Sequence, residues 1–319
     1  MHAFYRVLLL AFVAAFAVPA HSQYPSRPIR LVIPFPGGGG PVGVSVRALQ
    51  SLNDALGQRI VADNRPGADG EIAAEIVIKS APDGHTLFFG TNTAMSALPH
   101  LRKVSQFDPV TAFAPVAGFG RYTFFLYVHP TLPVKNVPEL IAHARANPGK
   151  LTYASGNSTG LVMMAQFALV NRLDMVNVNY KGDMMVISDM ASGRIQLMFG
   201  SSAITPLAKE GRIRVLAVML PTRSPLLPDV PPAPEAGLGN VTISAWGGVF
   251  APAKTPRAII EKLNREINAM LPKPELKAAF DLGGVAIMPM TPEQLGVHVK
   301  EQLELWGKTI RAAGIEPTN

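Results

Sequence analysis

Residues 31–41 read Leu-Val-Ile-Pro-Phe-Pro-Gly-Gly-Gly-Gly-Pro, an apolar run that opens into four consecutive glycines before a helical pattern begins. Glycine has no Cβ and the first N–H groups of a helix lack partners, so this order of elements bares backbone donors for an anion. A carboxylate fits such a loop as well as a phosphate does. A flexible surface turn without a ligand is the alternative at this point.

The glycine run does not match the phosphate-binding patterns of nucleotide-binding proteins. No Lys-Ser or Lys-Thr pair follows Gly37–Gly40, as the P-loop pattern requires. No acidic residue about 20 residues further on lies in a clear strand-helix-strand unit to hold a ribose. We therefore expect no nucleotide cofactor.

Strands and helices alternate along the first third of the chain. The predicted elements are a strand at 29–35, a helix at 44–56 ended by Gly57, a strand at 60–62, a helix at 72–80 and a strand at 86–90. This alternation favours a parallel sheet of the α/β class. Ligands of such sheets bind outside the carboxyl ends of the strands, which points to Pro36–Gly40 and to Thr91-Asn92-Thr93.

The middle of the chain repeats this pattern after a long apolar and aromatic run. That run, Ala114–Val128, is long enough to leave one domain and enter another. Three strand-like segments beyond it end in small or polar residues just before a helix. The segments concerned are Ser155-Gly156-Asn157-Ser158-Thr159, the turn Tyr180-Lys181-Gly182 before Asp183, and Gly200-Ser201-Ser202. Core packing does not explain this repetition, because a core needs apolar side chains.

The last third begins with an extended connection and ends in helices. Residues 221–239 carry six prolines without periodicity, and Val241–Phe250 then mirrors the earlier crossing strand. Two helices are expected to finish the molecule. Thr255 caps the first of them, and Thr291–Gln294 forms a capping box at the second, whose apolar face places Trp306 in the core.

Composition defines the compartment. The 319 residues suffice for two domains, and the chain is 48% hydrophobic, 16% charged and free of cysteine. Residues 1–22 have the pattern of a secretory signal peptide, with Arg6, an apolar run and a cleavage site after Ser22. Loss of that segment lowers the formal net charge from +7 to +6. The basic residues are scattered, so we expect a general attraction for anions and no nucleic-acid binding.

Catalytic and metal-binding patterns are not found in the sequence. Without cysteine, thiolate and Cys-zinc chemistry is excluded, and the histidines are dispersed. Ser158 is the middle residue of Gly156-Asn-Ser-Thr-Gly160, but this is no nucleophile elbow and no base is placed for it. The expectation is therefore a protein without catalytic residues, cofactor or metal; a secreted hydrolase is the enzyme alternative.

With these residues in hand, the chain resembles the tripartite tricarboxylate transporter substrate-binding family, also called the Bug receptors. The resemblance covers essentially the whole mature chain, and its motifs are specific in their order. They are Tyr24-Pro-Ser-Arg-Pro28, Asp63-Asn-Arg-Pro-Gly67, Ala81-Pro-Asp-Gly84, Gly90-Thr91, Phe113-Ala-Pro-Val116, Tyr153-Ala-Ser155, Tyr180-Lys-Gly182, Arg223-Ser224, Leu227-Pro-Asp-Val230, Glu235-Ala-Gly237 and Ala251-Pro252.

The resemblance implies a two-domain, Venus-flytrap periplasmic binding protein with two crossing strands. Its implied domains are 23–121 with 242–319, and 122–241. Such a receptor captures a small carboxylate between the domains and hands it to a membrane permease. The implied ligand-binding residues are Pro36, Gly37, Gly38, Gly39, Gly40, Thr91, Asn92, Thr93, Ser155, Gly156, Asn157, Ser158, Thr159, Lys181, Gly182, Asp183, Gly200, Ser201 and Ser202.

The chain departs from the usual family pattern at positions near these loops. Gly43, Met95, Leu98 and Gly200 stand where members commonly have Asp, His, Asn and Asp, and the loop after Ser155 lacks a common His. Our hypothesis is a cleft that is less polar and less acidic, for a carboxylate with an apolar or aromatic body. We expect a monomer in the periplasm. A ligand-sensing subunit that docks on a membrane sensor kinase is the alternative to transport.

Overall fold

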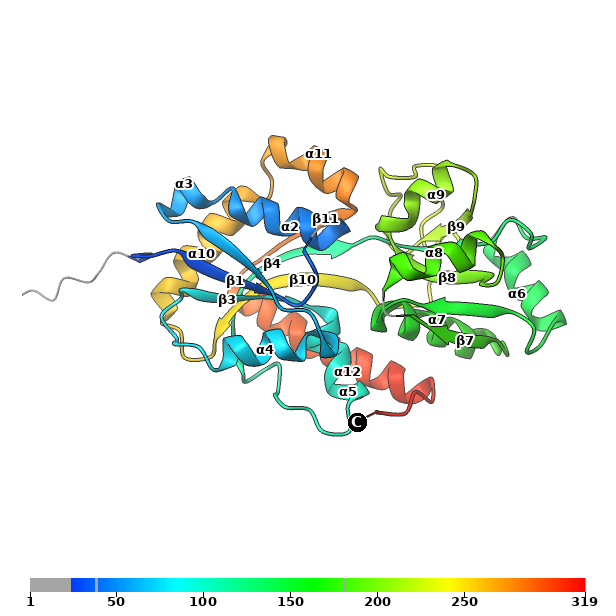
Figure 1. Cartoon of the computed structure of the whole chain (residues 1–319), viewed down its shortest axis with the longest axis horizontal. Coiled ribbons are helices and arrows are strands. Elements are labelled where there is room, and N and C mark those ends of the chain that lie inside the picture. The colour runs from blue at the N-terminus through cyan, green and yellow to red at the C-terminus, as the bar shows by residue number, and fades with distance from the viewer. Residues whose placement is uncertain (1–23, 38–39, 181, 319) are drawn as a thin grey trace, which may run out of the picture.

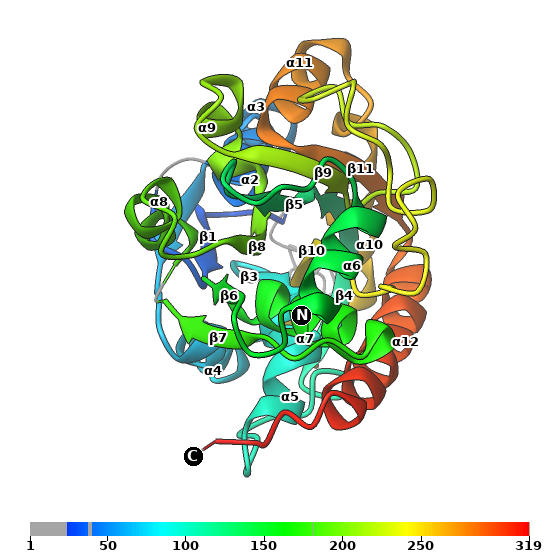
Figure 2. The same ribbon diagram turned by 90° about the vertical axis from the view of Figure 1, so that its right-hand side faces the viewer.

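The computed structural model describes residues 24–37, 40–180 and 182–318, and the predicted signal peptide lies outside them. Two lobes, each built around one β-sheet, lie side by side along the long axis of the molecule (Figure 1). In the view along that axis, lobe two lies in front of lobe one (Figure 2). Within the described residues, no helix is both long and apolar enough to cross a membrane.

Lobe one contains a six-stranded sheet in the order β11-β4-β10-β3-β1-β2. Strands β1, β2 and β3 run parallel, whereas β10 is antiparallel to β3 and β4, and β11 is antiparallel to β4. The bounds are β1 (Ile29–Ile33), β2 (Ile60–Asn64), β3 (Thr86–Thr91), β4 (Phe113–Tyr122), β10 (Ala245–Pro252) and β11 (Val285–Met290). The parallel strands are joined by helices, as the sequence pattern predicts.

Helices pack around this sheet and bury their apolar faces on it. The face of α10 that carries Ile260, Leu263 and Ile267 is buried, which matches its helical spacing. The helices of lobe one are α2 (Gly40–Gln50), α3 (Asn53–Leu56), η1 (Ala68–Gly70), α4 (Glu71–Ile78), η2 (Thr93–Ala97), α5 (Leu98–Leu101), α10 (Arg257–Met270), α11 (Pro274–Gly283) and α12 (Pro292–Ala312).

Lobe two contains a five-stranded sheet in the order β7-β6-β8-β5-β9. Strands β6, β7 and β8 are parallel neighbours, and β5 is antiparallel to β8 and β9. Its strands are β5 (Phe124–Val128), β6 (Thr152–Ser155), β7 (Val176–Asn179), β8 (Leu197–Ser201) and β9 (Arg214–Val218). Its helices are α6 (Val137–Ala146), α7 (Ser158–Asn171), α8 (Asp183–Ala191), η3 (Ser202–Ile204) and α9 (Thr205–Lys209).

The chain passes between the lobes twice. The long apolar run is two strands, β4 in lobe one and β5 in lobe two, joined at Thr123. The N–H of Thr123 donates to the carbonyl of Gly284 in lobe one, and its own carbonyl accepts from the N–H of Ser202 in lobe two. The second passage runs from β9 to β10. The helix α12 adds a further link, since it packs on β4 and η2 and also contacts α7 (Figure 1).

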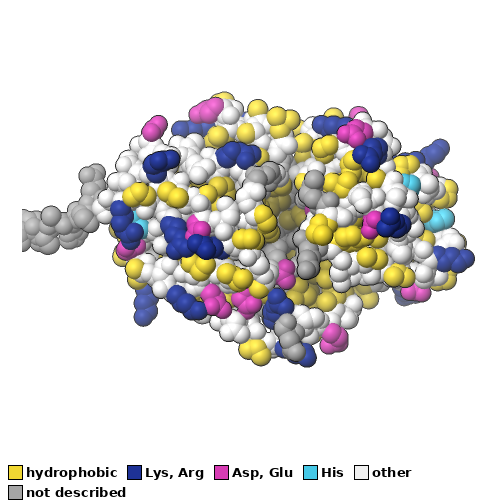
Figure 3. Space-filling view, in the orientation of Figure 1, with side chains coloured by type: hydrophobic (Ala, Val, Ile, Leu, Met, Phe, Trp, Pro, Cys, Tyr) yellow, Lys and Arg dark blue, Asp and Glu magenta, His cyan; other side chains and the backbone are white. Residues whose placement is uncertain are grey.

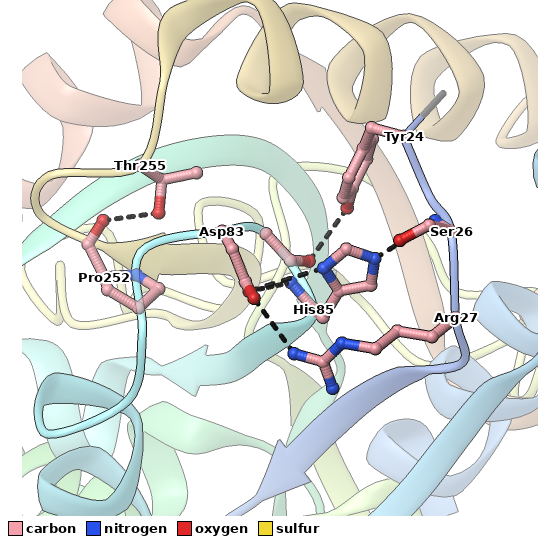
Figure 4. Close-up of polar contacts among 8 residues, drawn as sticks. Tyr24, Ser26, Arg27, Asp83, His85, Pro252 and Thr255 are labelled. Atoms are coloured by element: carbon pink, nitrogen blue, oxygen red, sulfur yellow. Dashed lines mark hydrogen bonds and ion pairs between the residues drawn. The ribbon is translucent and has the colours of Figure 1, made fainter. Parts of the chain in front are cut away.

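The described N-terminus lies at the edge of lobe one away from lobe two (Figure 1), where polar contacts anchor it (Figure 4). The Tyr24 hydroxyl donates to the carbonyl of Gly84 at 2.8 Å, and Arg27 pairs with Asp83 at 2.9 Å. His85 Nε2 accepts the N–H of Ser26 at 3.2 Å, and His85 Nδ1 lies 3.4 Å from Asp83 Oδ1. Burial, reinforced by the Asp83 charge, raises the pKa of Tyr24. These contacts fix the start of the chain and lie far from the facing strand ends.

Several predicted element boundaries are wrong. The helix expected at 44–56 begins earlier, at Gly40, and is interrupted after Gln50, where α3 follows as a separate turn. The hydroxyl of Thr255 donates to the carbonyl of Pro252 instead of capping α10, whose N-cap is Pro256. Two terminal helices were expected, but α11 and β11 stand between α10 and α12. The capping box of Thr291 and Gln294 and the burial of Trp306 are confirmed.

Candidate functional site

The predicted loops of both lobes lie at the carboxyl ends of their parallel strands. Pro36–Gly40 follows β1 and Thr91–Thr93 ends β3, and these two strands are neighbours in the sheet. In lobe two, the loops after β6, β7 and β8 carry Ser155–Thr159, Gly182–Asp183 and Gly200–Ser202. Of the predicted residues, Gly38, Gly39 and Lys181 lie outside the described residues.

Two hydrogen bonds show that these loops meet across the lobes. Asn92 Nδ2 donates to the hydroxyl of Thr159 at 2.7 Å, and the Ser158 hydroxyl donates to Asp69 Oδ1 at 3.2 Å. Asn92 and Thr159 are both buried. The structure therefore brings the end of β3 and the start of α7 into direct contact.

In lobe one, the glycine-rich loop leads into α2 as predicted. Gly40 begins this helix with a φ of +70°, a left-handed value that glycine tolerates without strain. The first turn of α2 carries no acidic side chain, so nothing in the helix itself offsets its positive end. Pro36 and Gly37 are exposed beside it. Geometry and charge at this helix start suit an anion.

Of the two polar side chains at the end of β3, one has hydrogen-bond partners and the other has none in the described part of the chain. Asn92 uses both ends of its amide, because Oδ1 accepts the backbone N–H of Trp246 at 3.1 Å while Nδ2 bonds Thr159. The Thr91 hydroxyl is buried and has no hydrogen-bond partner among the described residues. Asn92 thus joins three segments, whereas Thr91 keeps a donor.

We expect Asn92→Ala to lower the free energy of unfolding by about 1–3 kcal/mol, since it leaves the buried backbone N–H of Trp246 without an acceptor. Thr159→Val removes only the bond across the lobes. A double-mutant cycle in denaturant unfolding measures the coupling between the two residues. Strictly additive effects would show that the Asn92–Thr159 bond contributes nothing to stability.

In lobe two, the carboxylate of Asp183 ties two loops to the start of α8. Its Oδ1 accepts Asn157 Nδ2 at 2.6 Å, and its Oδ2 accepts the N–H of Ser201 at 2.8 Å. Asn157 is also the N-cap of α7, because its Oδ1 accepts the N–H of Gly160. Burial raises the pKa of Asp183, and the bonds from Ser201 and Asn157 oppose that shift. Asp183 is therefore an organiser of these loops.

Gly156 makes this arrangement possible. A Cβ at this position would lie 2.4 Å from Asp183 Oδ1 and 2.6 Å from the Asp183 backbone nitrogen. Only a residue without a side chain allows the two loops to approach so closely. The glycine in the loop after β6 is thus explained by contact with Asp183.

Two further predicted site serines of lobe two, Ser155 and Ser202, bond to protein groups. The Ser155 hydroxyl bonds the Oδ1 atoms of Asn177 and Asn179. The Ser202 hydroxyl donates to the carbonyl of Gly283 in lobe one at 3.1 Å. Ser202 therefore joins the lobes on the side of α11.

A cavity of 360 Å³ lies between the lobes, beside the start of α2. Its walls are α2 and α11 of lobe one and η3–α9 of lobe two, and most of its side chains are apolar. The lining residues are Gly40, Val44, Arg47, Ser202, Ala203, Thr205, Pro206, Ala279, Leu282 and Gly283. Gly40 and Ser202 are predicted site residues. The space-filling view shows a hollow between the two lobes (Figure 3).

The positions that depart from the family pattern have different surroundings. Met95 and Leu98 are fully buried, and Met95 packs in a cluster with Trp246, so neither supports the idea of a less polar cleft. A Cβ on Gly200 would lie 2.8 Å from the end of Met198 and 2.9 Å from Ile204. The space of a longer side chain at residue 200 is therefore occupied by apolar groups.

Asp69 is the residue that sequence reasoning missed. It follows the predicted turn at Asn64–Gly67 and has a φ of +54°, and residues 67–70 all have positive φ values. This left-handed loop carries the Asp69 carboxylate to Ser158 in the other lobe. An Asp-Gly pair after a turn was the available signal, but it does not reveal a contact between lobes. Among the described residues, no group of His, Cys, Asp or Glu is placed to hold a metal ion.

Two α/β lobes joined by crossing strands, with loops facing each other at the strand ends, define a two-domain periplasmic binding protein fold. Residues 45–315 match the family described as tripartite tricarboxylate transporter family receptor. The chain belongs to this family, whose members are solute-binding receptors and not enzymes.

Relatives and solved structures agree with this assignment. The chain is 34% identical over 294 residues to the UPF0065 protein in the tcbD-tcbE intergenic region of Pseudomonas sp. (strain P51), covering 90% of this chain and 86% of that protein. The R. palustris protein Rpa4515, solved with adipate, has a TM-score of 0.84 and 33% identity, covering 92% of this chain and all of that one. MatC from Rhodopseudomonas palustris, with bound malate, has a TM-score of 0.78 and 27% identity, covering 90% and 100%.

Proposed function

We propose that this protein is a periplasmic receptor that binds a small carboxylate between its lobes and delivers it to a tripartite membrane permease. The observation that carries the proposal is the start of α2, a helix N-terminus without an acidic side chain that opens onto the cavity between the lobes. Family membership and the two neighbours solved with adipate and malate support a carboxylate as the ligand.

In this proposal the ligand carboxylate bonds to the backbone N–H groups around Gly37–Gly40 and to Thr91. The Thr91 hydroxyl is a buried donor with no partner in the described part of the chain. Hydrogen bonds to a charged group contribute about 1.5–3 kcal/mol each, enough for two or three to bias a domain equilibrium. A ligand held between the lobes stabilises the closed arrangement in proportion to its preference for that state.

The cavity supports an apolar or aromatic body for this ligand. Val44, Ala203, Pro206 and Leu282 line it from both lobes, so an apolar group placed there contacts both at once. Burial of apolar surface stabilises by roughly 25 cal/mol per Å². The proposed ligand therefore presents its carboxylate to α2 and its body to this cavity.

A thermal-shift and calorimetry panel of aromatic and aliphatic acids tests the ligand class on the mature protein. At a hundredfold excess over Kd, a ligand adds about 2.7 kcal/mol to the free energy of unfolding. We expect acids with an apolar body to give this stabilisation. Stabilisation by citrate or malate alone would contradict the apolar body.

Ala279→Phe tests the location of that body. Ala279 lines the cavity on α11, and a phenyl group there takes up space that the ligand body needs. We expect affinity for an apolar-bodied acid to fall at least about fivefold, roughly 1 kcal/mol. Ala278→Phe, on the same helix but outside the cavity lining, is the matched control. Equal affinities for the two variants would place the ligand elsewhere.

Binding to a permease and binding to a sensor ectodomain distinguish transport from the alternative of a sensing subunit. We expect the liganded receptor to bind the membrane subunits and to support uptake of the acid by vesicles that contain them. Capture by a sensor ectodomain without uptake would favour sensing.

We also propose that the receptor acts as a monomer, which size-exclusion chromatography with light scattering measures.

A further inference from the structure

The polar side chains that open α7 are committed to protein partners. Asn157 donates to Asp183, Ser158 donates to Asp69, and Thr159 accepts from Asn92. Asn157 and Ser158 thus already donate to protein carboxylates, although the Asn157 amide keeps a second N–H. Unlike the start of α2, the start of α7 therefore already lies against two protein carboxylates.

The loop after β8 is committed in the same way. The N–H of Ser201 donates to Asp183 Oδ2, and the N–H of Ser202 donates to the carbonyl of Thr123. The Ser202 hydroxyl donates to Gly283. These donors of the loop after β8 therefore already bond to protein oxygens.

Two protein carboxylates contact the start of α7. Asp69 approaches Ser158 from lobe one, and Asp183 approaches Asn157 from lobe two, so both lie against consecutive residues at the start of α7. The pKa of the Asp183 carboxyl is set by its burial and by hydrogen bonds from Ser201 and Asn157. Among the described residues, no Lys or Arg contributes to it. A second carboxylate of the ligand would meet like charge here.

We propose that this receptor is selective for monocarboxylates: lobe one holds the single carboxylate, the uncharged part of the ligand lies in the cavity, and Asp69 and Asp183 disfavour a second carboxylate beside the loops of lobe two. This inference rests on the proposed function and narrows its ligand class. It separates this chain from the two structural neighbours solved with the dicarboxylates adipate and malate.

Matched acids test the inference on the full mature protein. Hexanoate and adipate share a chain length, and benzoate and terephthalate share a ring, so each pair differs by one carboxylate. By calorimetry at neutral pH, we expect each monoacid to bind at least about tenfold more tightly than its diacid, a difference of about 1.4 kcal/mol. Equal or tighter binding of both diacids would overturn the inference. If no acid of either kind bound, the proposed function itself would fail.

Two variants identify the source of the discrimination. Asp69→Asn, at an exposed residue, and Asp183→Asn each replace a carboxylate by a neutral amide. We expect each substitution to lower the ratio of diacid Kd to monoacid Kd by about threefold or more. Asp54→Asn, an exposed change on α3, is the control and should leave the ratio unchanged. Because Asp69 does not organise the loops of lobe two, its variant still tests the inference if Asp183→Asn fails to fold. If both variants fold, an unchanged ratio of diacid to monoacid Kd in both would contradict the inference. If only Asp69→Asn folds, an unchanged ratio in that variant would contradict it.

A preference for diacids that depends on a basic residue is the result that would oppose the inference. Arg47 lines the cavity, and Lys181 was predicted in the same cleft but lies outside the described residues. A wild-type preference for diacids that Arg47→Ala or Lys181→Met abolished would place a second carboxylate beside that residue. That result would overturn selectivity for monocarboxylates while leaving the receptor function in place.

Discussion

Gly156→Ala is expected to abolish high-affinity ligand binding and to lower the free energy of unfolding by about 1–3 kcal/mol, the usual cost of overpacking a tight site. The added Cβ would lie 2.4 Å from the Asp183 carboxylate and 2.6–2.7 Å from its backbone nitrogen and Cα. A side chain can rotate away, but these backbone atoms begin α8 and cannot. The loop after β6 must therefore move, and it carries Asn157 and the start of α7 with it.

Calorimetry and denaturant unfolding of Gly156→Ala measure both effects. Gly239→Ala is the matched control, because a Cβ there meets no atom within 4 Å. Adding Asp183→Ala to Gly156→Ala should not restore binding, since the clash with the backbone of residue 183 persists. Wild-type affinity in Gly156→Ala would show that the contact between the two loops is irrelevant to the site.

The second large effect is a loss of stability in acid caused by His298. Burial on α12, reinforced by the Arg121 charge, lowers the pKa of this residue from 6.5 to about 4. Its ring packs edge-on against Trp246 with centroids 4.9 Å apart, and His298 Nε2 has no hydrogen-bond partner among the described residues. The folded protein therefore keeps this imidazole neutral at pH values where an unfolded chain protonates it.

The sign of the effect follows from proton binding. Between pH 6.5 and 4 the unfolded state binds more protons at this residue, so stability falls as the pH is lowered through that range. A difference of 2.5 pKa units corresponds to about 3 kcal/mol. We expect His298→Phe, which keeps a ring against Trp246, to remove this part of the acid sensitivity.

Unfolding free energies at pH 7, 5.5 and 4.5 measure this contribution. His143→Phe, at a partly exposed position on α6, is the control and should keep the full pH dependence. The same pH dependence in wild type and His298→Phe would show that His298 does not titrate differently in the two states.

Much of the fold follows from local sequence. The alternation of apolar strands and amphipathic helices predicted two α/β units, and the long apolar run around Thr123 predicted a crossing between them. The strand β11 escaped prediction because it contains Pro289 and exposed residues. Proline is tolerated in an edge strand, where one N–H faces away from the sheet, and β11 is the edge of its sheet. A pattern based on buried strands cannot recognise it.

The site was predictable as a set of loops but not as a set of contacts. Glycine and small polar residues at strand ends located the loops, whereas the pairings of Asn92 with Thr159 and of Asp69 with Ser158 join residues 67 and 89 positions apart. Such distances lie beyond any local periodicity. The role of each predicted ligand-binding residue stays a prediction. For Asn157, Ser158 and Ser201, the bonds that they make within the protein argue for an organising role.

The helix α12 constrains how the receptor opens. Because it packs on the sheet of lobe one and also touches α7, a pure rotation about the crossing strands would separate that packed surface. Opening must then include a sliding of α7 over α12, and this shear component slows the rotation of the lobes. On opening, the separation of spin labels on α7 and α12 should change less than the separation of labels on α2 and α9. Truncation of the C-terminal turns should accelerate exchange between the open and closed populations.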